Sequence, residues 1–221
     1  MQQDDIFRIA SMTKAITATA VMMLYEEGKF GLDDPISKFI PEFKKPRVLT
    51  SFRFSDSTYT TQPAKSEITI RQLLTHTSGL GYGAIDADER FRALYHKARI
   101  VDAWTTAPLR LKENIEKLAK LPLHFNPGEK YSYSEGLDVL GYFIEVVSGV
   151  PFDVFLSKHL FEPLGMGDTH FYLPPAKYGR LVTVHKMQAG RWVASDGAFF
   201  DINFPRTGAK TYFSGGGGLS S

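Results

Sequence analysis

The stretch FRIASMTKAITATAVMMLYEEGKFGL, residues 7–32, joins a short apolar run to a helical pattern and places a serine three residues before a lysine. The run before Ser11 contains β-branched residues and is typical of a strand end. Beyond it, apolar residues recur at helical spacing, so we predict a helix with Ser11 as its N-cap and Gly28 as its stop. The spacing of Ser11 and Lys14 leaves two alternatives, a plain helix start or a nucleophile beside its base.

Ser11 and Lys14 have the residue types that nucleophilic catalysis needs. A serine hydroxyl is a weak nucleophile at neutral pH and requires a base within hydrogen-bonding reach. Positions i and i+3 share one face of a helix, and the helix N-terminus favours negative charge on the serine oxygen. A lysine acts as a base only when uncharged, which the apolar flanking residues favour. The alternative is that Ser11 only caps the helix and that Lys14 is solvated.

Tyr133 is a second candidate, in the segment YSYS at residues 131–134. It lies between a turn at Pro127–Gly128 and a predicted buried helix. A phenol can serve as the partner acid or base of a serine. The alternative is that Tyr131 and Tyr133 are ordinary aromatic residues on one face of a strand.

The composition excludes several classes of protein. The 221 residues, 43% hydrophobic and 23% charged, are enough for a sizeable core. A net charge of +2 indicates neither nucleic acid nor an anionic membrane as partner, and no apolar run reaches the ~18 residues of a membrane span. The absence of cysteine excludes disulfides and leaves the compartment, cytoplasmic or periplasmic, open. The first ten residues lack the pattern of a signal peptide.

Local patterns predict an α+β chain. We expect short helical turns in residues 33–43 and a loop or hairpin in 44–66. Helices are predicted at 69–79, 87–99, 112–123, 136–149 and 151–166, and strands at 180–187, 190–195 and 210–218. The chain should therefore be mostly helical over about 11–170 and strand-rich over about 171–221.

Four segments together resemble the serine β-lactamase-like family, which includes class C β-lactamases, DD-peptidases and family VIII carboxylesterases. They are residues 7–43, 68–80 (ITIRQLLTHTSGL), 126–149 (NPGEKYSYSEGLDVLGYFIEVVSG) and 215–221 (GGGGLSS). The resemblance implies one partial β-lactamase/transpeptidase-like domain over 1–221, a helical cluster packed on an antiparallel sheet. It implies that Ser11 is the acylated nucleophile of an S-x-x-K motif, with Lys14 as base partner and Tyr133 as the tyrosine of the Y-x-N element.

The chain departs from the family pattern at two places. Glu135 occupies the asparagine position of Y-x-N, where class C enzymes hold the substrate amide. We predict that Glu135 contacts substrate and disfavours β-lactams, because its carboxylate would repel theirs. The family's third motif, K-T-G or an equivalent, follows the glycine segment, whereas Lys210–Thr211 precedes it. We predict Gly216 and Gly217 as substrate-binding residues at a strand end close to the site.

These departures indicate an internal part of a longer enzyme with an incomplete sheet. The missing strand would carry an oxyanion donor, usually a large catalytic contribution. An open sheet edge also invites pairing with another chain. We therefore expect the 221 residues alone to be nearly inactive and to self-associate.

Other polar and aromatic residues give weaker signals. His76 is expected to be a hydrogen-bonded packing residue at a helix end, and the histidine spacings indicate no metal site. Residues 80–112 carry Tyr82, Phe91, Tyr95 and Trp104, which either wall an acyl pocket or form a surface loop packed on the helices.

The resulting hypothesis is a serine hydrolase that cleaves carboxylic esters without cofactor or metal. Its partner is a small ester or amide substrate, with no nucleic acid and no membrane span. A β-lactamase or D-amino-acid peptidase of the same family is the alternative within this class. The alternative of another class is a non-catalytic fragment whose sheet edges bind or assemble.

Overall fold

The computed structural model describes residues 2–197 and 201–221. Its α-helices are α1 (Thr13–Glu26), α2 (Ile70–Leu74), α3 (Glu89–Ala98), α4 (Leu111–Leu118), α5 (Gly136–Ser148) and α6 (Phe152–Leu156). Its strands are β1 (Arg47–Arg53), β2 (Thr58–Pro63), β3 (His185–Gln188) and β4 (Arg191–Ala194). Shorter turns are η1 (Ala10–Met12), η2 (Ile36–Lys38), η3 (Pro41–Phe43), η4 (Ser157–Phe161) and η5 (Pro175–Arg180).

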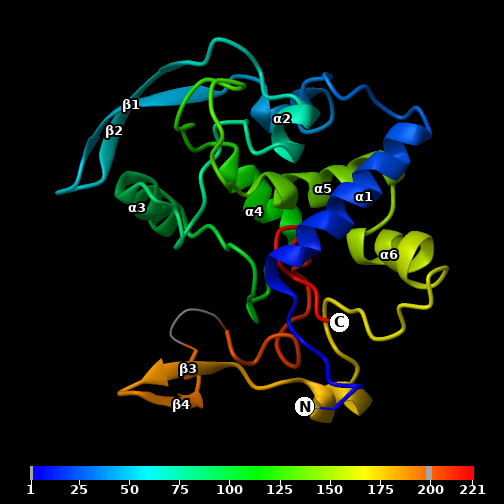
Figure 1. The fold of residues 1–221 in the computed structure, drawn as a ribbon. Coiled ribbons are helices and arrows are strands. Elements are labelled where there is room, and N and C mark those ends of the chain that lie inside the picture. The colour runs from blue at the N-terminus through cyan, green and yellow to red at the C-terminus, as the bar shows by residue number, and fades with distance from the viewer. Residues whose placement is uncertain (1, 198–200) are drawn as a thin grey trace.

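Helix α5 runs through the middle of the helical body and contacts α1, α2, α4 and α6 (Figure 1). Its sequence is apolar on nearly every face, and eight of its 13 residues are buried. A helix that is hydrophobic all round must be surrounded by other elements. Phe143 on this helix packs edge-to-face against Phe30 and Phe39, with ring centroids 4.9 and 5.0 Å apart. The core is therefore built around α5.

Most of the predicted helices are confirmed, with three corrections to their lengths. The 69–79 prediction is wrong beyond Leu74, because the chain turns at His76, which has a left-handed φ of 56°. The 112–123 prediction is wrong beyond Leu118, where α4 ends. The 151–166 prediction holds for α6, which continues into the wider turn η4 and ends there. All three departures lie at helix ends, where local periodicity carries little information.

Two small antiparallel sheets accompany the helices, so the α+β prediction is confirmed. The 44–66 segment forms the β1–β2 hairpin, and the two predicted strands at 180–195 form the β3–β4 hairpin. The predicted strand at 210–218 is wrong, because these residues are irregular and the glycines form a turn. That glycine-rich stretch folds back on itself through a bond from the Gly218 amide to the Ser214 carbonyl, 3.0 Å long.

The N-terminal segment pairs with the C-terminal one through isolated bridges. Phe7 and Ser221 exchange two backbone hydrogen bonds of 2.9 Å, and the Ile9 amide donates to the Leu219 carbonyl at 3.0 Å. The expected strand end at 6–10 is thus reduced to single bridges. This pairing places the start of α1 beside the glycine turn.

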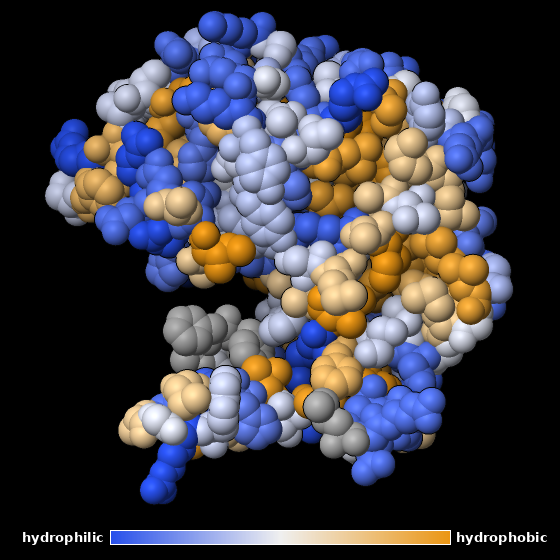
Figure 2. Space-filling view, viewed as in Figure 1, coloured by the Kyte–Doolittle hydropathy of each residue, from blue (hydrophilic) through white to orange (hydrophobic). Residues whose placement is uncertain are grey.

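The space-filling view shows the molecule hollowed between the helical body and the part that carries β3 and β4 (Figure 2). Among the described residues, no single helix is long and apolar enough to cross a membrane. The bent pair formed by α5 and residues Phe152–Phe161 passes that test by length and composition only.

Candidate active site

Ser11 lies in the tight turn η1, one turn ahead of α1. It is not the helix N-cap that its position in the sequence predicts, since neither η1 nor α1 has a side-chain cap hydrogen bond. The preceding residue, Ala10, has a φ of 47°, in the left-handed region that residues with a Cβ avoid. Such backbone strain is common at functional sites and fixes the direction of the following side chain.

Lys14 lies in the first turn of α1 and is only 8% exposed. Its Nζ donates to the Gly216 carbonyl oxygen at 2.6 Å, and lies 3.3 Å from Ser11 Oγ and 3.4 Å from the Tyr82 hydroxyl. The structure therefore brings Ser11 and Lys14 together, and it adds a phenol that the sequence did not assign to them.

Tyr133 reaches the same point from a segment 122 residues away, and its hydroxyl donates to Ser11 Oγ at 2.6 Å. Its ring stacks on Tyr82, with centroids 5.3 Å apart and planes 2° from parallel. The His76 ring also packs against Tyr133, with its centroid 4.8 Å away and its plane tilted by 40°. Lys14 Nζ lies 4.7 Å from the Tyr133 ring centroid. Tyr133 is therefore held by two rings with its oxygen at the serine.

His76 holds the Tyr133 segment as a neutral side chain. The Ser134 amide donates to Nδ1 at 3.2 Å, and the Ser134 hydroxyl lies 3.1 Å from the same nitrogen. Burial, and then the charge of Lys14, lower the pKa of His76 from 6.5 to about 4. The expectation of a hydrogen-bonded packing residue fits this geometry.

The glycine turn that contains Gly216 and Gly217 is tied to α1 and to the 99–110 segment. Thr17 donates its hydroxyl to the Gly215 carbonyl at 2.8 Å, and Trp104 Nε1 donates to the Gly217 carbonyl at 2.7 Å. A Cβ at Gly216 would lie 2.2 Å from Asp138 Oδ2, so only glycine fits there. Its carbonyl is thereby aimed at Lys14.

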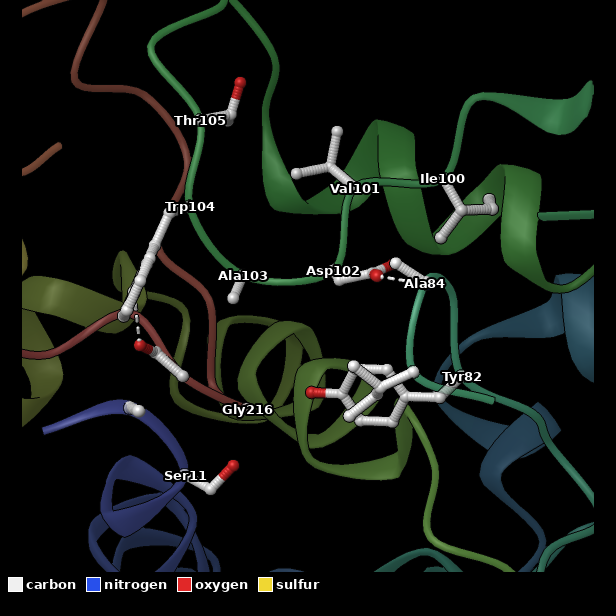
Figure 3. Close-up of a pocket in the computed structure, with 13 residues that line it drawn as sticks. Ser11, Tyr82, Ala84, Ile100, Val101, Asp102, Ala103, Trp104, Thr105 and Gly216 are labelled. Atoms are coloured by element: carbon white, nitrogen blue, oxygen red, sulfur yellow. Dashed lines mark hydrogen bonds between the residues drawn. The ribbon is translucent and has the colours of Figure 1, made fainter. Parts of the chain in front are cut away.

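A cavity of about 450 Å³ opens beside Ser11. Figure 3 shows Ser11 on one side, Tyr82 across from it, and the 100–105 segment running along the cavity to Trp104. Its lining is mostly apolar and comprises Ala10, Ser11, Tyr82, Ala84, Ile85, Ile100, Val101, Asp102, Ala103, Trp104, Thr105, Gly216 and Gly217. The cavity therefore suits an apolar group attached to a polar reacting centre.

The aromatic residues of the 80–112 segment divide into two groups. Tyr82 and Trp104 line the cavity, whereas Phe91 and Tyr95 are buried in the core on α3. Burial, followed by Glu135 and Asp138, raises the pKa of Tyr82 far above its ordinary value. Its phenol therefore stays protonated, which leaves Tyr133 as the hydroxyl that faces Ser11.

Glu135 does not line the cavity, contrary to the predicted contact with substrate. Its side chain is fully buried, because the Glu135 amide donates to the Gly81 carbonyl and turns the chain inward at the start of α5. The expected repulsion of a β-lactam carboxylate by an exposed Glu135 carboxylate therefore has no structural basis. Its neighbours are the carboxyl groups of Asp102 and Asp138.

The segment Lys210–Thr211 lies away from the cavity. Lys210 Nζ bonds to the Tyr178 hydroxyl at 3.3 Å, and the Thr211 hydroxyl donates to the Leu109 carbonyl at 2.9 Å. Tyr212 is fully buried. These residues support the 99–110 segment from beneath.

Sequence reasoning missed Tyr82 as a neighbour of Lys14 and Asp102 as part of the site. Tyr82 follows a glycine pair at residues 79–81 that the sequence shows, but its partner lies 68 residues earlier. Asp102 stands in a segment without periodicity. Both residues become visible only when the loops are folded over α1.

Comparison with known proteins gives a consistent result. A family model described as Beta-lactamase matches residues 1–221. The protein Rv1367c of Mycobacterium tuberculosis is 35% identical over 224 residues, covering 100% of this chain and 52% of that protein. Esterase EstB of Burkholderia gladioli is 38% identical over 171 residues, covering 77% of this chain and 40% of the esterase.

Among solved structures, the hydrolase EstCE1, described as having promiscuous acyltransferase activity, superposes with a TM-score of 0.80 at 29% identity. The match covers 100% of this chain and 56% of EstCE1. The chain thus spans about half the length, or less, of the curated relatives it matches. The likeness confirms the predicted β-lactamase/transpeptidase-like fold.

Proposed function

The chain belongs to the beta-lactamase family, and we propose that it acts as a serine hydrolase that cleaves carboxylic esters through an acyl-Ser11 intermediate. One observation carries the proposal: the Tyr133 hydroxyl lies 2.6 Å from Ser11 Oγ, with Lys14 Nζ 3.3 Å from the same oxygen. A nucleophile held by two titratable partners beside a cavity is the arrangement that acyl transfer requires.

Before acylation, the Tyr133–Lys14 pair releases one proton to solvent. Ser11 Oγ then bonds to the ester carbonyl carbon while the serine proton passes to this deprotonated pair. The tetrahedral adduct collapses and its oxyanion becomes a carbonyl again, the bond from carbon to the alkoxy oxygen of the leaving group breaks, and the leaving alcohol takes the proton from the pair. Water then repeats the sequence on the acyl group and restores Ser11. Tyr133 makes the shorter contact, so it exchanges the proton with Ser11 directly.

Lys14 contributes charge and position to this pair. Its bond to the Gly216 carbonyl fixes Nζ near both oxygens, and Nζ lies 4.7 Å from the Tyr133 ring centroid. Tyr82, which stays protonated, holds Lys14 from the other side. The Ser11 amide, at the N-terminal turn of a helix, is suited to donate to the developing oxyanion.

The cavity supports an ester with an apolar acyl group. Ile85, Ile100, Val101 and Ala103 line it, and Trp104 carries an apolar ring whose nitrogen is already bonded to Gly217. An acyl chain of a few carbons gains ~0.8 kcal/mol for each buried methylene group. The relationship to esterase EstB favours the same reaction class.

An alcohol can replace water as the acceptor of the acyl group in the second step. The related hydrolase EstCE1 is described as having promiscuous acyltransferase activity, and both reactions pass through one acyl-serine. Adding a simple alcohol to an ester assay and measuring the new ester tests this acceptor. If product appears only as free acid at every alcohol concentration, acyl transfer to alcohols is rejected.

The reaction class is tested by comparing p-nitrophenyl butyrate with the β-lactam nitrocefin. We expect a higher kcat/KM for the ester, with both activities lost in Ser11→Ala and retained in Ser51→Ala, a change on the exposed hairpin. Faster turnover of nitrocefin would reject the esterase proposal in favour of a β-lactamase. Ester turnover that persists in Ser11→Ala would reject the acyl-Ser11 intermediate and leave the non-catalytic alternative for this site.

A further inference from the structure

Three carboxyl groups lie together at the glycine turn, and one of them, that of Asp102, belongs to a residue that also lines the cavity. Glu135 and Asp138, at the start of α5, are fully buried, and Asp102 belongs to the 99–110 segment. The Glu135 carboxyl faces those of both Asp102 and Asp138, close enough for one proton to be shared among them. Neither Glu135 oxygen has an N–H or hydroxyl donor in the described part of the chain.

Three ionised carboxylates cannot hold this arrangement. Carboxylates only accept hydrogen bonds, and buried like charges repel strongly. Lys14 is the cation that acts on the cluster, through Asp138. The other titratable groups facing Glu135 are Tyr82, Tyr95 and Tyr212. Burial raises their pKa values, so they stay neutral, and a phenol carries no positive charge in either state.

The carboxyl groups of Asp102 and Asp138 each accept a hydrogen bond from a part of the candidate site. Asp102 Oδ2 accepts the Ala84 amide at 2.8 Å, which joins the two segments that wall the cavity (Figure 3). Asp138 Oδ1 accepts the Ser214 hydroxyl at 2.6 Å at the base of the glycine turn. A Cβ at Gly83 would lie 1.9 Å from Asp102 Oδ1, so the backbone presses directly on the cluster.

We propose that Glu135 is a positioning residue whose carboxyl keeps its proton in the folded protein and shares it with Asp102 and Asp138, thereby joining the cavity wall to the glycine turn that holds Lys14. The part of this proposal that concerns catalysis rests on the proposed ester hydrolysis. The part that concerns the shared proton is independent of it. The burial of Glu135 and the two neighbouring carboxylates raise its pKa well above 4.5 in agreement with this geometry.

The stability of the protein should carry the signature of this proton. The pKa of Glu135 is raised in the folded state, so folded Glu135 binds its proton more tightly than unfolded Glu135 does. Its contribution to stability is therefore fully present below pH 4.5 and is lost as the pH rises through the folded-state pKa. Glu135→Gln keeps an N–H donor but cannot ionise, so the stability of this variant should not decrease in this way as the pH rises.

Two measurements test the proposal without any assay of turnover. Infrared spectra at pH 7 should show a protonated carboxyl band that disappears in Glu135→Gln and persists in Glu26→Gln, a change at an exposed position on α1. The Tm of Glu135→Gln minus that of the unchanged protein should increase steadily from pH 4.5 to pH 9. Absence of the band at pH 7, or a Tm difference independent of pH, would overturn the proposal.

A second variant keeps the test decisive if Glu135→Gln does not fold. Asp102→Asn removes one of the charges facing Glu135 and retains an oxygen for the Ala84 amide, so the alkaline loss of stability should become shallower. If the loss of stability at alkaline pH were unchanged in this variant, it would contradict the shared proton.

In the ester assay, the decrease of kcat/KM at alkaline pH should occur at a higher pH in Glu135→Gln than in the unchanged protein. If no variant turns over an ester while the carboxyl band is present, only the proposed function fails.

Discussion

Two polar clusters meet at Gly216, and they satisfy their buried polar groups in different ways. On the open side, Lys14, Tyr133 and Ser11 supply both donors and acceptors beside a cavity. On the sealed side, Glu135 and Asp138 are fully buried, and together with Asp102 at the cavity wall they are all acceptors unless one keeps a proton. Polar groups need partners in either place, but the open side presents its donors and acceptors to a ligand in the cavity.

The two clusters therefore differ in their proposed roles: the open side reacts with the substrate, and the sealed side holds the site in position. The carbonyl of Gly216 faces Lys14, while Asp138 leaves room only for glycine at the same residue. Changes on the open side should therefore affect the rate of acylation first. Changes on the sealed side should act through pH-dependent stability.

The largest effect is expected on removing the nucleophile of the open side. Ser11→Ala should abolish the ester turnover that the unchanged protein shows, because loss of the nucleophile removes the covalent route. Steady-state kinetics with p-nitrophenyl butyrate measure this, and unchanged far-UV circular dichroism verifies the fold. A decrease of less than tenfold would place the nucleophile elsewhere.

The next effect distinguishes two tyrosines only two residues apart. Tyr133→Phe should reduce kcat by about 10²–10⁴-fold, the usual contribution of a positioned proton-transfer group. Tyr131→Phe is the matched control, because Tyr131 is 68% exposed and its ring contacts only the edge of the same cluster at His76. Equal rates in the two variants would show that the contact between Tyr133 and Ser11 has no role in catalysis.

A smaller effect is expected on the choice of acyl chain. Ala103→Phe adds a ring to the cavity wall and should lower the ratio of kcat/KM for octanoyl to acetyl esters by at least about tenfold. Acetyl ester turnover by the same variant is the internal control for an intact catalytic group. A ratio that stays constant would mean that the acyl chain binds outside this cavity.

The smallest effect concerns the acid stability of the open side. His76 is held neutral, with a pKa lowered from 6.5 to about 4, so the unfolded chain binds more protons in that interval. Stability should therefore decrease as the pH falls from about 6.5 toward about 4. His76→Gln should make this decrease shallower, as followed by Tm, whereas His185→Gln at an exposed strand position should not. Identical slopes in both variants would contradict a neutral, half-buried His76.

The fold and the open side were largely accessible from sequence, because their signals are local or combine into one family pattern. Helix α5 follows from its apolar residues, and Ser11 with Lys14 from their spacing within one helix. The glycine stretch at 215–218 was misinterpreted as a strand end because a glycine run has no side-chain pattern to distinguish a strand from a turn.

The sealed side was not accessible in the same way. Asp102, Glu135 and Asp138 come from separate segments, and sequence alone placed Glu135 toward the substrate. The backbone bond from Glu135 to Gly81 decides its direction, and no periodicity encodes that bond. For Tyr82 the sequence leaves a pocket wall and a packed surface loop as alternatives, and its contact with Lys14 depends on how the 80–86 loop folds over α1.

Mapping the acyl adduct tests the central proposal most directly. The protein is mixed briefly with p-nitrophenyl butyrate, quenched with acid and digested with trypsin, which releases residues 9–14 as one peptide that contains Ser11 as its sole serine. We expect a butyryl group on Ser11 in this peptide, at greatly reduced occupancy in Tyr133→Phe and undiminished in Tyr131→Phe. A butyryl group found on another residue while this peptide stays unmodified would contradict the acyl-Ser11 mechanism.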